Sequence, residues 1–464
     1  MSNALLSTAQ SWSITDSPLN STEELFTWIR DRNEAVAVEI RKVVPEPEDF
    51  WFYDWAEGRI RNRNRSFFSI SGFRSSLTNR EMLEQPILLQ EEIGYLGILC
   101  KEFSGVMHFL MQAKIEPGNV NCVQISPTIQ ATKSNFTQKH GGAKPPYLEY
   151  FLNTSRYEIV VDQIQSEQSS RFYKKRNRNI IIRLEEDVPV LPSHRWMTLG
   201  QIKKLMREDN LVNMDTRTVL SCVPFSQLQI PELGLLELAD SFRDKTLFRS
   251  AFVGEQENRL PEIYQYINNL KMFSEEKPEL LPLHELEDWE WRNGEFVCRK
   301  PWPFKVTFCD ISIEGREVKH WIQPLFEAMG VATFGLVCCE ESGILKFLVR
   351  ATPEVGCFDG VELGPTVQRE AMPAGEVKET AVDKLFDQRI QTGEGIFFDH
   401  LLSEEGGRFY HEQNRNVLLR VTREELPPLP EGYFLLDYKT LNQLVQVNNT
   451  LNIQLRNLLS LLEA

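Results

Sequence analysis

The clearest pattern of hydrophobic and polar positions lies between residues 106 and 140. A largely apolar run from Val106 to Met111 predicts a buried β-strand. A Pro-Gly turn follows at 117–118, and from Gln124 polar residues occupy every second position, so an extended segment would place them on one face. Their neutral donor and acceptor groups suit a ligand rich in hydroxyl, carbonyl and phosphate oxygens, although the wet face of an ordinary strand remains an alternative.

Patterns elsewhere predict a mixture of helices and strands. The polar residues 1–20 are expected to be loose, whereas capping and apolar periodicity predict helices at 21–29, 199–213 and 216–222. Residues 50–73 predict a β-hairpin, in which an aromatic strand is followed by a Glu-Gly turn and a return strand. Residues 180–184 are a further predicted strand, and Asn293-Gly294 predicts a hairpin turn.

The pattern of the first half returns in the second half. Gly97 corresponds to Gly335, which lies 238 residues later. Arg171-Phe172-Tyr173 corresponds to Arg408-Phe409-Tyr410, with a shift that is one residue shorter. The shift of 238 also pairs identical residues at Ser104, Gly105, Phe109, Leu110, Ala113, Glu116, Gly118, Pro127, Thr128 and Gln130. Chance does not preserve such a register. We therefore predict two duplicated modules, at residues 1–223 and 261–464, joined by a helical segment at 224–260.

The two copies differ at chemically important positions. The second has Arg350, Thr352, Glu362 and Gly364 where the first has Gln112, Lys114, Gln124 and Ser126. No counterpart of the Ser134-Asn135 and His140-Gly141-Gly142 segment is present in the second copy. A shared fold and a shared pocket are therefore predicted, with unequal chemistry.

Composition narrows the functional classes. A chain of 464 residues with 42% hydrophobic and 25% charged residues is typical of a globular protein with more than one domain. The formal charge of −15 argues against nucleic acids and anionic membranes as partners. We expect no signal peptide and no membrane span, and the eight cysteines, without a CxxC pair, predict reduced thiols in a cytoplasmic protein.

Cofactor motifs are missing from the sequence. It contains no GxGxxG motif after a strand, no P-loop and no lysine context typical of pyridoxal phosphate, and its seven histidines lack the spacing of metal ligands. The sequence therefore predicts neither a cofactor nor a metal.

The segment QAKIEPGNVNCVQISPTIQATKSNF, followed by KHGG and YLEYF, resembles the signature of the NDP-hexose 2,3-dehydratases. The resemblance implies a carbon-oxygen lyase that acts on dTDP-4-keto-6-deoxyglucose in deoxysugar biosynthesis. Such an enzyme removes the C3 proton and the C2 hydroxyl, and the enol formed becomes a 3,4-diketo-2,6-dideoxy sugar. The resemblance further implies that the protein is a homodimer and that each chain has an α+β fold. Each chain would contain two tandem duplicated Nudix-hydrolase-like modules, and each module would form an α/β/α sandwich around a mixed sheet.

Elimination beside a ketone needs a base, a donor to the enolate oxygen and an acid for the departing hydroxide. Glu116 is a candidate base or acid, His140 a candidate for proton transfer and Lys114 a candidate donor to enolate or phosphate. Each also has a structural alternative: a carboxylate that caps the turn, a surface histidine and a solvated lysine. Arg171, Arg176 and Arg178 are candidates for the pyrophosphate, because guanidinium groups bind such oxygens in pairs.

The remaining predicted site residues fall into two sets. By the resemblance or by repetition between the copies, substrate contacts are expected from Gln112, Asn119, Gln124, Ser126, Thr128, Gln130, Ser134, Asn135 and Tyr173. A second pocket is expected from Arg350, Glu354, Thr366, Gln368, Arg408, Tyr410 and Arg415.

Two other functions remain open from the sequence. A Nudix-type nucleotide-sugar pyrophosphohydrolase would need a helix of clustered glutamates to bind magnesium. The nearest candidate, residues 80–86, is interrupted by Gln85-Pro86 where a second carboxylate should stand. The other possibility is a non-catalytic protein that binds sugar nucleotides.

Overall fold

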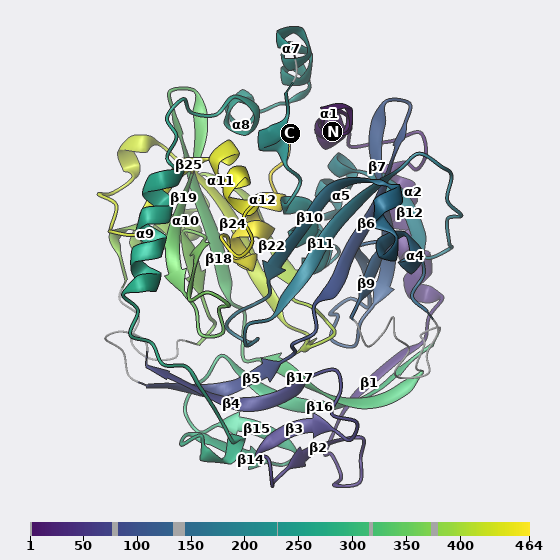
Figure 1. Cartoon of the computed structure of the whole chain (residues 1–464), viewed down its shortest axis with the longest axis vertical. Helices are drawn as coiled ribbons and strands as arrows, with labels where there is room; N and C mark the ends of the chain where they lie inside the picture. Colours follow the sequence, from purple (N-terminus) through teal and green to yellow (C-terminus); the bar gives the residue numbers. More distant parts are fainter. Residues whose placement is uncertain (1, 77–81, 133–143, 230, 315–318, 373–378) are drawn as a thin grey trace.

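Two seven-stranded mixed sheets stand side by side in the upper layer of the molecule (Figure 1). The computed structural model describes residues 2–76, 82–132, 144–229, 231–314, 319–372 and 379–464. We call residues up to 223 the first half and those from 261 the second half. The predicted α+β class, with mixed sheets, is confirmed.

The sheets of the two halves have the same strand order. The first runs β10-β11-β6-β7-β12, with β8 beside β7 and β9 beside β6, and the second runs β22-β24-β18-β19-β25, with β20 beside β19 and β21 beside β18. The first set is β6 (Gly94–Phe103), β7 (Val106–Ile115), β8 (Val123–Ser126), β9 (Ile129–Ala131), β10 (Glu158–Ser166), β11 (Arg176–Leu184) and β12 (His194–Thr198). The second set is β18 (Thr333–Glu341), β19 (Ile344–Pro353), β20 (Val361–Gly364), β21 (Val367–Arg369), β22 (Ile396–Ser403), β24 (Gln413–Val421) and β25 (Tyr433–Asp437).

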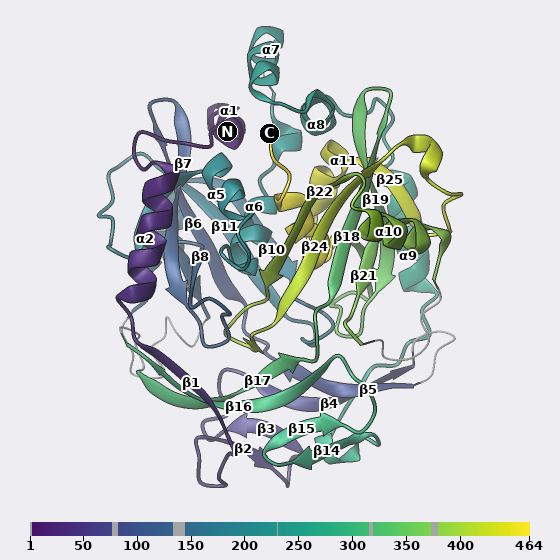
Figure 2. The ribbon, with the colours of Figure 1, turned by 180° about the vertical axis from the view of Figure 1, so that it is seen from behind.

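A lower layer of two smaller sheets crosses beneath both upper sheets (Figure 2). The six-stranded sheet contains β14 (Trp289–Arg292), β15 (Glu295–Cys298), β16 (Phe304–Ile313), β17 (His320–Ala328), β23 (Phe409–Tyr410) and, from the first half, β1 (Val38–Val43). The five-stranded sheet contains β2 (Trp51–Asp54), β3 (Arg59–Asn62), β4 (Ser69–Ser76), β5 (Met82–Leu89) and, from the second half, β13 (Glu279–Leu281). Each half thus contributes one strand to a sheet of the other.

Short helices between the two upper sheets join the halves. They are α5 (Leu199–Leu205), α6 (Met214–Ser221), α11 (Tyr438–Val445) and α12 (Ile453–Ser460), and α6 packs against α12. Their apolar side chains belong to one hydrophobic core that includes residues of both sheets. The halves therefore share a core, and loops can pass from one to the other.

The remaining helices cover the outside or link the halves. These are α1 (Ser2–Ser13), α2 (Thr22–Glu34), α4 (Leu148–Leu152), α7 (Glu232–Ser241), α8 (Lys245–Phe248), α9 (Leu260–Met272) and α10 (Ala381–Thr392). Short 3-10 or π turns are η1 (Thr154–Arg156), η2 (Phe225–Gln227), η3 (Arg249–Val253), η4 (Leu283–Glu285) and η5 (Arg423–Glu425). Helices α2 and α9 lie at opposite sides of the upper layer, and α7 projects from it (Figure 1).

Several local predictions are confirmed. Ser21 and Glu24 form a capping box at the start of α2, whose buried face includes Leu25, Trp28 and Ile29. The hairpin β2–β3, the strand β7 and the helix α6 also form where the sequence predicts them. Asn293 and Gly294 have the positive φ angles of a tight hairpin turn between β14 and β15.

Two local predictions are wrong. Residues 2–13 form helix α1, because Ala4, Ala9 and Trp12 are buried and its hydroxyl side chains bond to backbone; Ser11 Oγ, for example, donates to Met107 O at 2.6 Å. The helix predicted at 199–213 ends at Leu205. The residues after it turn toward the second half, where Asn210 N donates to Leu401 O at 2.8 Å.

Candidate active site

A buried glutamate follows strand β7 of the first-half sheet. Glu116 is 6% exposed and lies one residue beyond the end of β7. Its Oε1 accepts a hydrogen bond from Lys114 Nζ at 3.0 Å and from Gln130 Nε2 at 3.3 Å. Since Lys114 and Glu116 are two residues apart in extended backbone, their side chains leave the same face of the chain.

An asparagine extends this network to a serine. Asn213 Nδ2 donates to Ser126 Oγ at 2.9 Å and to Gln130 Oε1 at 3.4 Å. The same side chain caps α6, where its Oδ1 accepts from Thr216 N at 2.8 Å. The cap fixes the amide, so Asn213 orients Gln130 and through it Glu116. We call this set, with Gln124, the first-half site.

A loop of the second half completes the first-half site. Gly118 N donates to Gly406 O at 2.7 Å, and His411 N donates to Gly118 O at 2.9 Å. A β-carbon on Gly118 would lie 1.5 Å from Phe409 O, so only glycine permits this approach. In the adjoining strand, Gln124 Nε2 donates to Ser403 Oγ at 2.5 Å. The site therefore consists of side chains from both halves.

The second half contains a site of the same construction. Glu354 accepts from Gln368 Nε2 and from Asn452 Nδ2, each at 2.8 Å. The loop of the first half closes over it, because Gly356 N donates to Ser169 O at 2.9 Å and Lys174 N donates to Gly356 O at 2.7 Å. We call Glu354, Gln368, Asn452 and Glu362 the second-half site.

Most of the residues predicted from the signature lie close together. Lys114, Glu116, Ser126 and Gln130 belong to one network, and the register places Gln112 of β7 opposite Ser126 of β8. The side chain of Asn119 is buried at the turn, where Nδ2 donates to Cys122 O at 2.8 Å. Ser134, Asn135 and His140 lie outside the described residues, so their predicted roles stay predictions.

Two predicted threonines bond to backbone. Thr128 Oγ1 accepts from Leu99 N at 2.9 Å and donates to Leu110 O. Thr366 makes the same two contacts, with Val337 N and Leu348 O. These bonds join neighbouring strands in each half; a role of either threonine in substrate binding stays a prediction.

The two Arg-Phe-Tyr segments cross between the halves. Arg171 lies beside second-half residues: it is 1% exposed, its guanidinium donates to Glu370 at 3.1 Å, and it stacks on Phe304. From its position in the sequence, Arg408 is predicted to belong to the second pocket. Its guanidinium instead donates to Gln90 Oε1 of the first half. Each loop thus lies against the other half, a grouping that sequence position does not predict.

The other predicted cations and tyrosines lie on or near strands. Arg178 pairs with Asp162 at 2.6 Å, and its mate Arg415 pairs with Asp399 at the same distance. Arg176 stacks on Phe358, and Arg350 donates to Tyr433 Oη at 3.4 Å. Tyr173 N bonds to Leu88 O, and Tyr410 belongs to β23. Phosphate binding by these arginines stays a prediction.

Sequence reasoning missed three polar residues at the first-half site. They are Asn213, Glu405 and Asp215, of which Asp215 is 2% exposed with an Oδ2 that has no hydrogen-bond partner. Burial raises the pKa of Asp215 well above its usual value, and the carboxylates of Glu405, Glu167 and Glu116 add to the effect. A comparison of the copies near their ends could have revealed Asn213, since it has an identical mate in Asn452.

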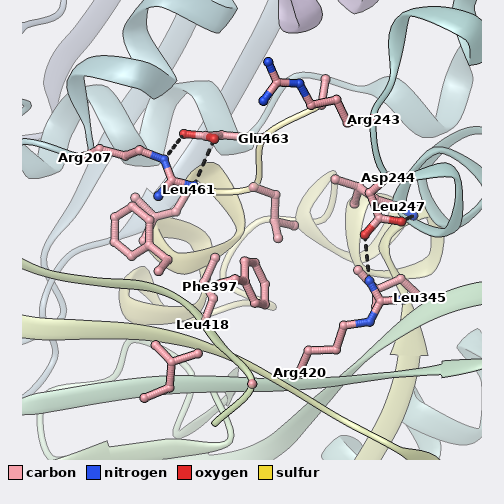
Figure 3. A pocket seen from close by; sticks show the side chains of 15 residues that line it. Arg207, Arg243, Asp244, Leu247, Leu345, Phe397, Leu418, Arg420, Leu461 and Glu463 are labelled. Atoms are coloured by element: carbon pink, nitrogen blue, oxygen red, sulfur yellow. Dashed lines mark hydrogen bonds and ion pairs between the residues drawn. The ribbon is translucent and has the colours of Figure 1, made fainter. Parts of the chain in front are cut away.

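Other parts of the molecule offer different surfaces. Among the described residues, no group of three or more His, Cys, Asp or Glu side chains is arranged to hold a metal ion. Of the helices in the described ranges, none has the length and apolar character needed to cross a bilayer. A pocket of about 440 Å³ lies apart from both sites, where Phe397, Leu418 and Leu461 meet Arg207, Arg243 and Arg420 (Figure 3).

Comparisons with known proteins agree along nearly the whole chain. The model of the family described as NDP-hexose 2,3-dehydratase matches residues 22–223 and 260–462. A dTDP-4-dehydro-6-deoxy-alpha-D-glucopyranose 2,3-dehydratase of Saccharopolyspora spinosa is 36% identical over 447 residues, covering 96% of this chain and 91% of the relative. Proteins of the same name from Streptomyces violaceoruber and Amycolatopsis orientalis are 34% and 32% identical, covering 95% and 98% of this chain and 97% and 93% of their own lengths.

Proposed function

The chain belongs to the NDP-hexose 2,3-dehydratase family, and we propose that it converts dTDP-4-keto-6-deoxyglucose into the 3,4-diketo-2,6-dideoxy sugar by loss of water. The observation that carries this function is the similarity to three such dehydratases over at least 95% of the chain. The protein is a carbon-oxygen lyase of deoxysugar biosynthesis.

The polar network around Glu116 supports a site for this chemistry in the first half. Glu116 is the proposed base for the C3 proton, and Lys114, 3.0 Å from it, is the proposed donor to the oxygen that gains charge in the enolate. His140 is proposed to assist proton transfer. Because the C4 carbonyl accepts the electrons of the C3–H bond, the reaction needs no external oxidant.

Substrate recognition is proposed for the polar residues of the same surface. Their amide and hydroxyl groups suit a sugar nucleotide. The set comprises Gln112, Asn119, Gln124, Ser126, Thr128, Gln130, Ser134 and Asn135, with Arg171, Tyr173 and Arg178 proposed for the nucleotide. A second pocket is proposed around Arg350, Glu354, Thr366 and Gln368, with Arg408, Tyr410 and Arg415.

We further propose that the two halves are duplicated modules of Nudix-hydrolase-like fold, at residues 1–223 and 261–464. The shared strand order and the matching threonine bonds support a common origin. The segment at 224–260 is the proposed connection and contains α7 and α8.

A homodimer in the cytoplasm is the proposed state of the protein. Leu233 and Leu236 on the projecting helix α7 are 70% and 59% exposed, and such apolar residues are typical of surfaces that bind another chain. The eight cysteines are all free thiols, as expected in a reducing compartment. Sedimentation of the purified protein would test the dimer.

The function can be tested with the purified protein and dTDP-4-keto-6-deoxyglucose. We expect consumption of the substrate without added metal or nicotinamide, and a chemically trapped product whose mass equals that of the substrate minus one water plus the trapping group. Complete loss of activity with a chelator, restored by magnesium, would contradict the proposal.

A pyrophosphohydrolase would instead release dTMP with magnesium. That alternative is not favoured, because the residues after Glu81 form strand β5, whereas its magnesium signature requires a helix.

A further inference from the structure

The loop that the second half places over the first-half site carries a carboxyl group. Glu405 lies immediately before Gly406, whose carbonyl accepts the hydrogen bond of Gly118 N. A β-carbon on Gly407 would lie 2.9 Å from Oε1 of Glu405 and 3.4 Å from Oε1 of Glu116. The two carboxyl groups, one from each half, therefore border the same small space beside a residue without a side chain.

The hydrogen bonds of these two carboxyl groups differ. Glu116 accepts from Lys114 and Gln130, an arrangement that suits a carboxylate acting as a base. Across the described part of the chain, no hydrogen bond or ion pair is made by the carboxyl group of Glu405, so its oxygens are available to hold and donate a proton. Burial raises the pKa of Glu405; Arg408 opposes the rise and the neighbouring Glu116 carboxylate adds to it.

The second-half site lacks this carboxyl group. The segment Glu404-Glu405-Gly406-Gly407-Arg408 aligns with Glu167-Gln168-Ser169-Ser170-Arg171, so an amide, Gln168, stands at the position of Glu405. The alignment is supported by structure, because Glu404 accepts from Asn414 as Glu167 accepts from Asn177.

A second acid is replaced in the same way. Asn213 and Asn452 cap α6 and α12, and two residues later Asp215 of the first half aligns with Gln454 of the second. The asparagine caps are thus kept, while at these two aligned positions the first-half site has carboxyl groups and the second-half site has amides.

We propose that Glu405, contributed by the second half, is the catalytic acid of the first-half site. The inference rests on the proposed function. After Glu116 removes the C3 proton, the electron pair of that bond forms the enolate with C4. When the C4 carbonyl is restored, the pair forms the C2–C3 double bond and the C2–O bond breaks. The proton of Glu405 passes to the departing oxygen, which leaves as water, and Glu405 becomes a carboxylate.

Glu405→Gln tests this step, because it reproduces the amide of the second-half site. In deuterium oxide, wild-type enzyme should exchange the C3 hydrogen and lose water, whereas Glu405→Gln should still exchange it while dehydration falls by at least about 10²-fold. Mass spectrometry of recovered substrate and trapped product measures both reactions. Glu116→Gln should lose both. Glu404→Gln, the same change one residue away, should leave the ratio of exchange to dehydration unchanged.

Two results would overturn the inference: dehydration by Glu405→Gln at the wild-type rate, or equal loss of exchange and dehydration in a protein that melts normally. Should Glu405→Gln fold poorly, Glu405→Ala with added formate gives a second test, in which recovery of dehydration supports the acid role and its absence contradicts it. A wild-type protein that neither exchanges nor dehydrates the substrate would overturn the proposed function itself.

Discussion

In both halves a glutamate follows the long strand beside the sheet centre, a glutamine donates to that glutamate, and an asparagine donates to the glutamine. At three aligned positions the first half has Lys114, Glu405 and Asp215 where Thr352, Gln168 and Gln454 stand in the other copy of the pattern. The backbone contacts are nearly the same, including the glycine that meets a loop of the opposite half. Since Glu116 and Glu354 are identical, the expected difference in chemistry between the halves lies in the surrounding groups that differ, such as Lys114, Glu405 and Asp215.

The largest expected contrast is between two identical substitutions. Glu116→Gln should lower kcat by about 10²–10⁴-fold, because it removes the proposed base. Glu354→Gln should leave kcat within a few-fold of wild type. Steady-state kinetics and thermal melting of both variants measure the contrast. If only Glu354→Gln were inactive, the catalytic site would lie in the second half.

The next contrast concerns the arginine that joins the halves. Arg171→Ala leaves Glu370 without its cation and removes a buried guanidinium from the contact between the halves, which is expected to destabilise the fold by about 1–3 kcal/mol. Urea unfolding measures this change. Below the melting temperature, KM should rise more than kcat falls if Arg171 also binds the pyrophosphate. A destabilised variant with unchanged KM would limit Arg171 to holding the halves together.

Gly118 and Gly356, at which a loop of the opposite half contacts the chain, should respond alike to substitution by alanine. A β-carbon on Gly118 or Gly356 would lie 1.5 Å from Phe409 O or 1.9 Å from Phe172 O. Each substitution to alanine should therefore displace a loop and destabilise the protein by about 1–3 kcal/mol. Differential scanning calorimetry compares the pair. A large loss in one variant alone would show that the two crossings are not equivalent in energy.

The smallest expected effect is on the pH dependence of stability. Burial raises the pKa of Glu412 to about 8, although Arg171 opposes the shift, and its counterpart in the other loop is Lys175. Because the folded-state pKa lies above the ordinary value of 4.5, the stabilisation by Glu412 is complete below that value and is lost as pH rises through about 8.

Glu412→Gln should accordingly flatten the fall of Tm across that range. The exposed Glu431→Gln provides the control and should keep the wild-type slope. An unaltered slope in Glu412→Gln would assign the pH dependence to other buried carboxyl groups.

The sequence alone predicts much of the local structure. The apolar run of β7, the capping box of α2 and the Asn-Gly turn each depend on neighbouring residues, and each forms as predicted. The signature also predicts which residues around Glu116 lie together, because alternation along two paired strands places them on one face. Helix α1 was missed because its buried hydroxyl groups find partners only in the folded chain.

What the tertiary structure decided is which residues complete each site. Glu405 is 289 positions from Glu116, and nothing in local periodicity relates them. They meet because the loop after β22 passes to the first half, and because Gly118, in the turn after β7, lets the backbone of that loop approach. Sequence determined the strands, the repeat and the family; the packing of one half on the other determined that each site contains side chains of both.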